Sequence, residues 1–110
     1  MSYSKGEIVL FPYPFMDLSA KKVRPAVIVG ITESKYNDVF IAPLTSKTDN
    51  LGAGEFILSD WKPAGLNVSS AVKRGCYLVD CGLILKSVEK LSKMDLDNLE
   101  KSLRTWLDLK

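Results

Sequence analysis

The spacing of the apolar residues changes near residue 92, and this change limits the fold more than any other feature of the sequence. Before it, short runs rich in valine and isoleucine alternate with loops rich in proline, glycine and polar residues, a pattern typical of β-strands. After it, large apolar residues recur at helical spacing. The predicted strands are 7–11, 24–31, 39–44, 55–58, 70–72 and 76–79.

The last part of the chain is predicted to form one amphipathic helix. Ser92 can cap its first turn, and Asp95, three residues later, completes a capping-box pattern. The apolar face, which we expect to lie in the core, consists of Leu96, Leu99, Leu103, Trp106 and Leu107. The pattern indicates a mainly β fold, a small and partly open β-barrel with a C-terminal helix packed across it. Other small β-rich folds would share this pattern.

The length of 110 residues predicts a single domain, residues 1–110. Hydrophobic residues make up 46% and charged residues 25%, which is typical of a soluble globular protein. The chain has no run of about 20 apolar residues, as a membrane helix would need. Its N-terminus is polar and lacks the apolar part of a secretory signal. We therefore expect a cytoplasmic protein with no membrane partner.

The chain contains no histidine, which excludes a Ser–His triad, a catalytic His–His pair and a typical catalytic zinc site. Its two cysteines, Cys76 and Cys81, are five residues apart, which fits neither a redox CxxC motif nor a zinc ligand set. We interpret them as buried, small apolar residues on opposite faces of a strand. We expect no metal and no cofactor.

The net charge of +2 does not by itself indicate a nucleic-acid partner, but the cations are clustered. One cluster contains Lys21, Lys22 and Arg24, and another contains Lys73 and Arg74. A solvated surface is the usual role of such clusters, and contact with phosphates is the alternative.

Four segments carry a resemblance to a known family. GEIVLFPYPF stands at 6–15, RPAVIV at 24–29, PLTS at 43–46, and GL followed by SAVK within 65–73. In this order they resemble the segments of MazF/PemK-type toxins of type II toxin–antitoxin systems, and the resemblance covers most of residues 5–105.

This resemblance implies an SH3-like barrel that forms a homodimer and cleaves single-stranded RNA without a metal. The implied products are a 2′,3′-cyclic phosphate and a free 5′-hydroxyl. The implied protein partner is a cognate antitoxin that inserts into the same groove. The family's arginine before proline matches Arg24, and its threonine matches Thr45.

The predicted catalytic residues are Arg24, Thr45 and Ser46. When the RNA 2′-hydroxyl attacks the neighbouring phosphorus, negative charge grows on the phosphoryl oxygens. The guanidinium of Arg24 can bind two of those oxygens, and the hydroxyls of Thr45 and Ser46 can donate to the same centre. The alternatives are a strand-start arginine paired with a surface carboxylate, and turn hydroxyls that cap a loop.

The group that moves the proton is not evident from the sequence. Some relatives carry an aspartate where this chain has Gly75. Asp17, Glu7 and a bound water are the possible substitutes. The departure at Gly75 leaves an alternative function open: a non-catalytic RNA- or protein-binding module, such as the gyrase-inhibiting relatives of this barrel.

The predicted RNA-binding residues come before and after the predicted catalytic residues in the sequence. They are Phe15, Asp17, Lys21, Lys22, Lys73 and Arg74. Phe11, Tyr13 and Phe15 could stack on bases. Aromatic residues two apart on an extended segment more often belong to a core or a subunit interface, and we favour that interpretation.

Overall fold

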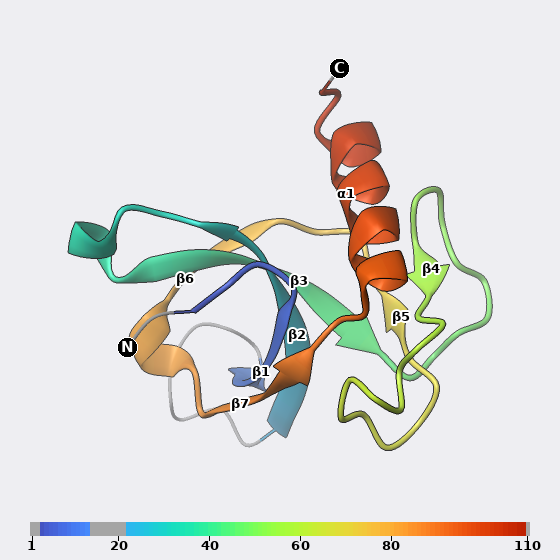
Figure 1. Ribbon diagram of the computed structural model, residues 1–110, viewed down its shortest axis with the longest axis horizontal. Helices are drawn as coiled ribbons and strands as arrows, with labels where there is room; N and C mark the ends of the chain where they lie inside the picture. The colour runs from blue at the N-terminus through green and yellow to red at the C-terminus, as the bar shows by residue number, and fades with distance from the viewer. Residues whose placement is uncertain (1–2, 14–21, 110) are drawn as a thin grey trace.

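The computed structural model describes residues 3–13 and 22–109, and its strands form one antiparallel sheet (Figure 1). The strands are β1 (Glu7–Tyr13), β2 (Lys22–Ile31), β3 (Asp38–Thr45), β4 (Phe56–Ile57), β5 (Ala71–Val72), β6 (Tyr77–Asp80) and β7 (Lys86–Lys90). The helices are η1 (Ser34–Tyr36), η2 (Cys81–Leu83) and α1 (Lys93–Trp106). The strand order is β4-β5-β3-β2-β1-β7, and β6 also pairs with β3. The end strands β4 and β7 do not pair with each other among the described residues, which confirms a mainly β, partly open architecture with a C-terminal helix.

Strand β2 lies in the middle of the sheet and separates two cores. It pairs with β1 on one side and with β3 on the other. Because side chains alternate along a strand, Val27 and Val29 face the helix-side core, whereas Ala26 and Ile28 face the opposite core. All four residues are buried, so this part of β2 is covered on both faces.

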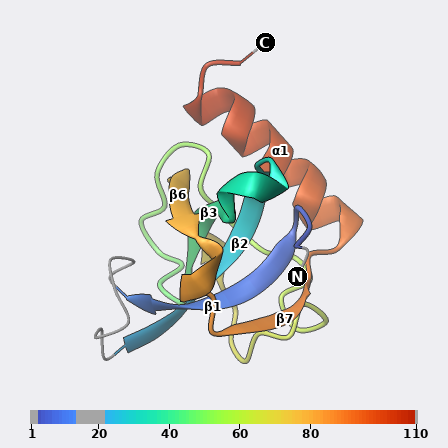
Figure 2. The ribbon, with the colours of Figure 1, turned by 90° about the vertical axis from the view of Figure 1, so that its left-hand side faces the viewer.

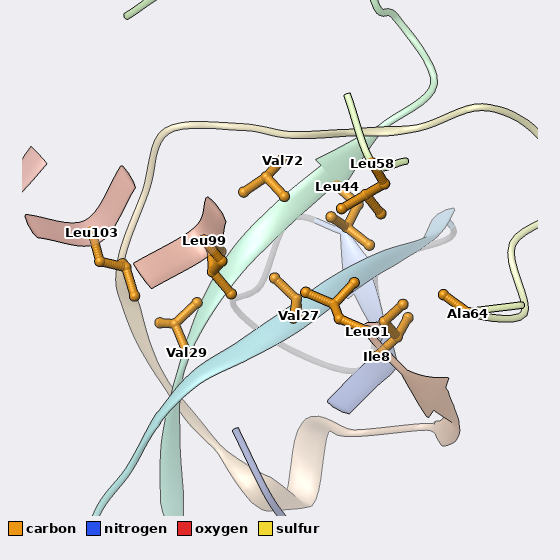
Figure 3. Packing of buried hydrophobic residues seen from close by; sticks show 11 residues of the cluster. Ile8, Val27, Val29, Leu44, Leu58, Ala64, Val72, Leu91, Leu99 and Leu103 are labelled. Carbon is orange, nitrogen blue, oxygen red and sulfur yellow. The ribbon is translucent and has the colours of Figure 1, made fainter. Parts of the chain in front are cut away.

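The helix-side core is formed where α1 packs on the sheet (Figures 2 and 3). Leu99 and Leu103 are buried there against Val27, Val29 and Ile8, which confirms the predicted helical face at these positions. Leu107 departs from the prediction, because the helix ends at Trp106 and Leu107, which follows as the C-cap, is exposed.

The predicted cap of α1 is confirmed, but Asp95 has a different role from the one expected. The Ser92 hydroxyl accepts a hydrogen bond from the Asp95 backbone N–H at 3.2 Å. The buried Asp95 carboxylate accepts hydrogen bonds from the backbone N–H groups of Ser59 and Asp60, each at 2.9 Å. Asp95 therefore connects the start of the helix to the loop after β4.

Among the described strands, β7 is the one that the sequence did not predict. Its sequence, KSVEK, contains a single apolar residue, Val88, which packs against the helix-side core. Charged side chains on an end strand discourage pairing with other chains. Because of them, the strand has no apolar run by which it could be predicted from the sequence.

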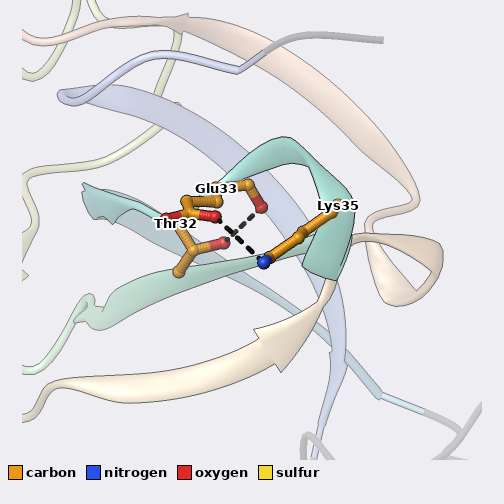
Figure 4. A network of polar contacts seen from close by, with 3 residues as sticks. All are labelled: Thr32, Glu33 and Lys35. Atoms are coloured by element: carbon orange, nitrogen blue, oxygen red, sulfur yellow. Dashed lines mark hydrogen bonds and ion pairs between the residues drawn. The ribbon is translucent and has the colours of Figure 1, made fainter.

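The β2–β3 hairpin ends in an exposed polar cluster at its tip, drawn in Figure 4. The Thr32 hydroxyl donates to the Glu33 carbonyl at 3.4 Å, and the Lys35 ammonium lies 3.5 Å from the Glu33 carboxylate. Exposed ion pairs of this kind contribute roughly 0–1 kcal/mol. The hairpin therefore depends on its strand pairing and on the two cores.

The cysteines are half-buried free thiols that pack on opposite sides of the sheet, Cys76 against the helix-side core and Cys81 against the opposite core. Burial raises the pKa of both thiols, and the neighbouring Asp80 and Asp38 raise that of Cys81 further. Within residues 3–13 and 22–109, none of the helices has the length and apolar character of a membrane span.

Candidate functional site

Arg24 stands near the start of β2, where one face of the sheet changes from apolar to charged. It lies opposite Phe11 of β1 and two residues before Ala26, so its side chain belongs to the face that carries the opposite core. Phe11 is fully buried and Arg24 is exposed. The core interpretation of Phe11 is therefore confirmed, and the sheet face beyond it is charged.

Thr45 lies on the same face as Arg24. The pairing of β2 with β3 ends at Ala26 and Pro43, and Arg24 and Thr45 each stand two residues beyond that pair. Side chains two residues apart on a strand share a face, so both project from this end of the sheet. The Thr45 hydroxyl accepts a hydrogen bond from the Lys47 backbone N–H at 3.1 Å, which is the turn-capping role considered above. Its proton remains available for donation.

Lys73 belongs to the same face by a similar argument. Val72 pairs with Leu44, and the Lys73 backbone N–H then donates to the Pro43 carbonyl at 2.9 Å. Lys73 therefore lies beside Pro43, on the face that carries Arg24 and Thr45. We call Arg24, Thr45 and Lys73 the Arg24 face.

Arg74 is held through its backbone. Its N–H donates to one oxygen of the Glu55 carboxylate at 2.9 Å, and the Gly52 N–H donates to the other oxygen at 2.7 Å. These two hydrogen bonds, with a smaller contribution from the positive charges of Lys73 and Arg74, lower the pKa of Glu55. In the part of the chain that the structure describes, neither cation forms an ion pair.

The ring of Tyr77 covers Gly75, the residue that the resemblance matches to an aspartate of some relatives. A Cβ atom on Gly75 would lie 2.4 Å from Cε2 of Tyr77 and 3.2 Å from Cδ of Pro43. An aspartate therefore does not fit here unless Tyr77 moves. Tyr77 pairs with Ile41, a residue of the opposite core, so it projects from the same side of the sheet as the Arg24 face. No role for Tyr77 was predicted from the sequence, although an aromatic residue two positions after Gly75 was visible there.

Ser46 is separated from Thr45 by the alternation of side chains. It lines a groove of about 680 Å³ with Leu44, whose side chain belongs to the helix-side core. Lys22 and Arg24 also line this groove, whereas Thr45, Lys73 and Arg74 do not. Arg24 therefore shares the Arg24 face with Thr45. It shares the lining of the groove, on the other side of the sheet, with Ser46.

The remaining predicted residues divide into two groups. Phe15, Asp17 and Lys21 lie outside the described residues, as does the side chain of Tyr13. Glu7 is described, but it stands four residues from Phe11 along β1, which is about 13 Å at the rise of a strand. Its carboxylate accepts hydrogen bonds from Ser4 and Ser87, which hold it away from Arg24 and from an RNA 2′-hydroxyl bound there. The described residues contain no cluster of His, Cys, Asp or Glu that could hold a metal ion.

Comparisons with solved structures identify the fold. An endoribonuclease in complex with its cognate antitoxin, from a mycobacterial species, has a TM-score of 0.76 at 15% identity, over 99% of this chain and 98% of that chain. The Mycobacterium tuberculosis toxin MazF-mt6 has a TM-score of 0.71 at 20% identity, over 94% and 98%. A chain of the MazE–MazF structure from Deinococcus radiodurans has a TM-score of 0.73 at 20% identity, over 100% and 99%.

The sequence comparison identifies the family. No protein of curated function matches the chain. The model of the PemK-like, MazF-like toxins of type II toxin–antitoxin systems matches residues 4–107, which is nearly the whole chain. The similarity to this family therefore covers nearly the whole fold and not only the four short segments. The chain belongs to the family of PemK-like, MazF-like toxins of type II toxin–antitoxin systems.

Proposed function

We infer that this toxin is an endoribonuclease that cleaves single-stranded RNA without a metal ion. The observation that carries this proposal is the Arg24 face, where a guanidinium, a hydroxyl and an ammonium share one open end of the sheet. These donor types suit a phosphate whose charge increases during the reaction. One of the structural neighbours described above is an endoribonuclease, which supports the same activity.

In the proposed reaction, the RNA 2′-oxygen bonds to phosphorus and the bond from phosphorus to the 5′-oxygen breaks. Arg24 binds the non-bridging oxygens through two N–H groups, and Thr45 donates its hydroxyl proton to one of them. Lys73 holds the neighbouring phosphate. The products are a 2′,3′-cyclic phosphate and a free 5′-hydroxyl.

Tyr77 is our candidate for the proton donor, because its phenol lies on the side of the sheet where the family's aspartate would stand. The phenol gives its proton to the leaving 5′-oxygen, the 2′-hydroxyl proton passes to solvent water, and solvent then reprotonates Tyr77. Tyr77→Phe should lower the cleavage rate while leaving RNA affinity unchanged.

The direct test incubates the purified protein with a long single-stranded RNA in EDTA. Wild type should produce fragments that end in a cyclic phosphate. Arg24→Ala should be about 100- to 1,000-fold slower, the usual cost of removing one oxyanion donor. Arg104→Ala is the matched control, because Arg104 belongs to the last turn of α1, and both ribbon views show that end of the helix away from the start of β2 (Figures 1 and 2). Intact RNA with wild type, or equal rates for Arg24→Ala and wild type, would reject the proposal.

We also propose that the toxin forms a homodimer and binds a cognate antitoxin. Strand β6 pairs only with β3 among the described strands, and its residues Tyr77 and Leu78 are exposed. An apolar strand edge of this kind suits a subunit interface. Light scattering should give a dimer for wild type and a monomer for Leu78→Asp, whereas Leu109→Asp, at another exposed leucine, should remain dimeric.

The packing of Tyr77 over Gly75 also favours a second candidate, a family member that binds RNA and does not cleave it. If the phenol does not donate the proton, no other described residue of this face replaces the aspartate. RNA that remains bound and uncut over long incubation, with binding lost in Arg24→Ala, would support the second candidate.

A further inference from the structure

The groove beside Ser46 lies on the other side of the sheet from the Arg24 face and has no role in the function proposed so far. Val23 and Pro25 alternate with Arg24 along β2, so their side chains face the groove. The segment 65–68 lies across from them, and β7 contributes Lys86. The groove therefore opens between the start of β2, the end of β3 and β7.

A glycine brings the segment 65–68 close enough to form a wall. Gly65 has a φ of +85°, and a Cβ atom there would lie 2.5 Å from Cγ1 of Val88. Only a residue without a side chain can approach β7 this closely in this conformation. The wall that follows presents Leu66, Asn67 and Val68 to the groove.

The charge of the groove is entirely positive among the described residues that line it. Its charged lining residues are Lys22, Arg24 and Lys86, of which Lys86 projects on the groove's side of the sheet, and no described aspartate or glutamate lines the groove. Lys86 of β7 pairs with Leu10 of β1, and its ammonium forms no ion pair with a described residue. A lysine held at the edge of a groove without a carboxylate partner is suited to bind an anion.

The mouth of the groove is apolar and exposed. Val23 and Val68 each keep 52% of their surface accessible, and the half-buried Leu66 lies between the mouth and the helix-side core. Exposed branched side chains that gather at a groove mark a site of contact more often than a solvated surface. Beside them, Asn67 and Ser46 provide hydrogen-bonding groups.

We propose that this groove binds a nucleotide that flanks the cleaved phosphate, with Lys86 on the nucleotide's phosphate and Val23 and Val68 on its base. Arg24 projects from the Arg24 face and is also among the residues that line the groove, so it stands at the boundary between the two and a strand bound there would reach the groove next. The positive charge and this continuity favour RNA as the occupant over a protein segment. The inference rests on the proposed function, because it extends the same RNA path.

The test measures the affinity of a fluorescent 2′-O-methyl RNA of mixed sequence, which binds but cannot be cleaved because the attacking hydroxyl is blocked. Lys86→Gln should weaken binding about fivefold at 0.1 M salt and reduce the slope of log affinity against log salt by about 0.7, as expected for one phosphate contact on a single strand. Val68→Asp, which puts a carboxylate in the groove, should weaken binding at least as much.

Two variants provide matched controls. Lys90→Gln removes the same charge from the same strand, but Lys90 lines a different pocket, with Tyr3 and Glu7. Ile57→Asp changes an exposed aliphatic residue that does not line the groove. Both controls should bind RNA as wild type does.

The outcomes separate this inference from the proposed function. If wild type cleaves RNA and Lys86→Gln binds RNA as tightly as Lys90→Gln does, the groove inference is wrong and the nuclease proposal stands. If Lys86→Gln and Val68→Asp keep their RNA affinity but lose a co-expressed antitoxin, the groove is a protein-binding site and the inference is also wrong. If wild type neither binds nor cleaves RNA, both proposals fail.

Discussion

The sheet formed by β1, β2 and β3 and the segment 46–70 are held in place by different interactions. In the sheet, the alternation of side chains fixes the position of each residue, and apolar side chains fill a core on both faces. In the segment 46–70, only Leu58, Ala64 and Ser70 are buried, and polar side chains from elsewhere in the chain hold its backbone. The structure of the sheet therefore depends on its repeated apolar pattern, and that of the segment 46–70 depends on a few individual polar contacts.

Helix α1 supplies most of those contacts. Besides the two hydrogen bonds that Asp95 accepts, the Ser102 hydroxyl donates to the Gly54 carbonyl at 2.6 Å, and the Trp106 indole N–H donates to the Ala53 carbonyl at 2.9 Å. The helix therefore has two roles, because its apolar face fills a core while its polar groups fix a segment at least 35 residues earlier. That segment begins directly after Thr45, so its conformation limits the shape of the candidate site.

The largest effect is expected from a substitution in the sheet. Ile28 is fully buried in the opposite core, so Ile28→Ala should lower the free energy of unfolding by about 2–5 kcal/mol through lost burial and a new cavity. Urea denaturation measures the change. Ile31→Ala, at an exposed position on the same strand, should change it by less than about 0.5 kcal/mol. Equal losses for the two variants would contradict the role given to the buried pattern.

A smaller and more local effect is expected at Asp95. Asp95→Ala leaves the backbone N–H groups of Ser59 and Asp60 without their acceptor, which should cost about 2–3 kcal/mol. Hydrogen exchange should accelerate most at those two amides, whereas Ile28→Ala should affect the amides of the sheet more evenly. Asp97→Ala, in the same helix, removes only an exposed pair with Lys93 and should cost up to about 0.5 kcal/mol. Uniform acceleration in Asp95→Ala would show that the segment is not held separately.

The difference between the two regions explains how much of the fold the sequence predicted. The strands around 24–31 and 39–44 are predicted from their apolar runs and the helix after Ser92 from its apolar periodicity, and burial of these same residues stabilises the elements in the structure. The role of Asp95 in the segment 46–70 was not predicted, because a capping-box pattern gives no sign of the partners that a carboxylate finds far away in sequence. Strand β7 was missed because its pairing with β1, and not its composition, makes it a strand.

The candidate site shows the same division. Alternation along β2 and β3 places Arg24 and Thr45 on one face, and the same rule, applied to the sequence alone, is enough to separate Ser46 from Thr45. In contrast, Tyr77 over Gly75 and Lys86 at the groove depend on strands that meet only after folding. Contacts between such strands cannot be predicted from a single sequence.

Gly54 tests how closely α1 holds the segment 46–70. Its φ is +81°, and a Cβ atom there would lie 2.4 Å from Nε1 of Trp106. Gly54→Ala should therefore cost about 1–2 kcal/mol from the left-handed backbone alone, and the displaced indole should also weaken its hydrogen bond to Ala53. Gly52→Ala is the control, since a Cβ at Gly52 would lie at an ordinary distance of 3.4 Å from the Glu55 carboxylate. Thermal denaturation and tryptophan fluorescence should change in Gly54→Ala and remain near wild type in Gly52→Ala.

The smallest effect is expected at Glu55, which connects the segment 46–70 to Arg74 and depends on pH. The N–H groups of Arg74 and Gly52 stabilise the charged carboxylate and lower its pKa below the ordinary value of 4.5. A carboxyl group with a lowered folded-state pKa stabilises the protein above its unfolded-state pKa, and this contribution is lost as the pH falls through the folded-state value. The urea midpoint of wild type should therefore fall more steeply below pH 4.5 than that of Glu55→Gln, with accelerated exchange at the Arg74 amide. Glu33→Gln, which removes only the exposed pair with Lys35, should follow the wild-type profile. Parallel profiles for Glu55→Gln and wild type would mean that the carboxylate does not hold the segment, and that packing under α1 alone fixes the backbone beside Lys73.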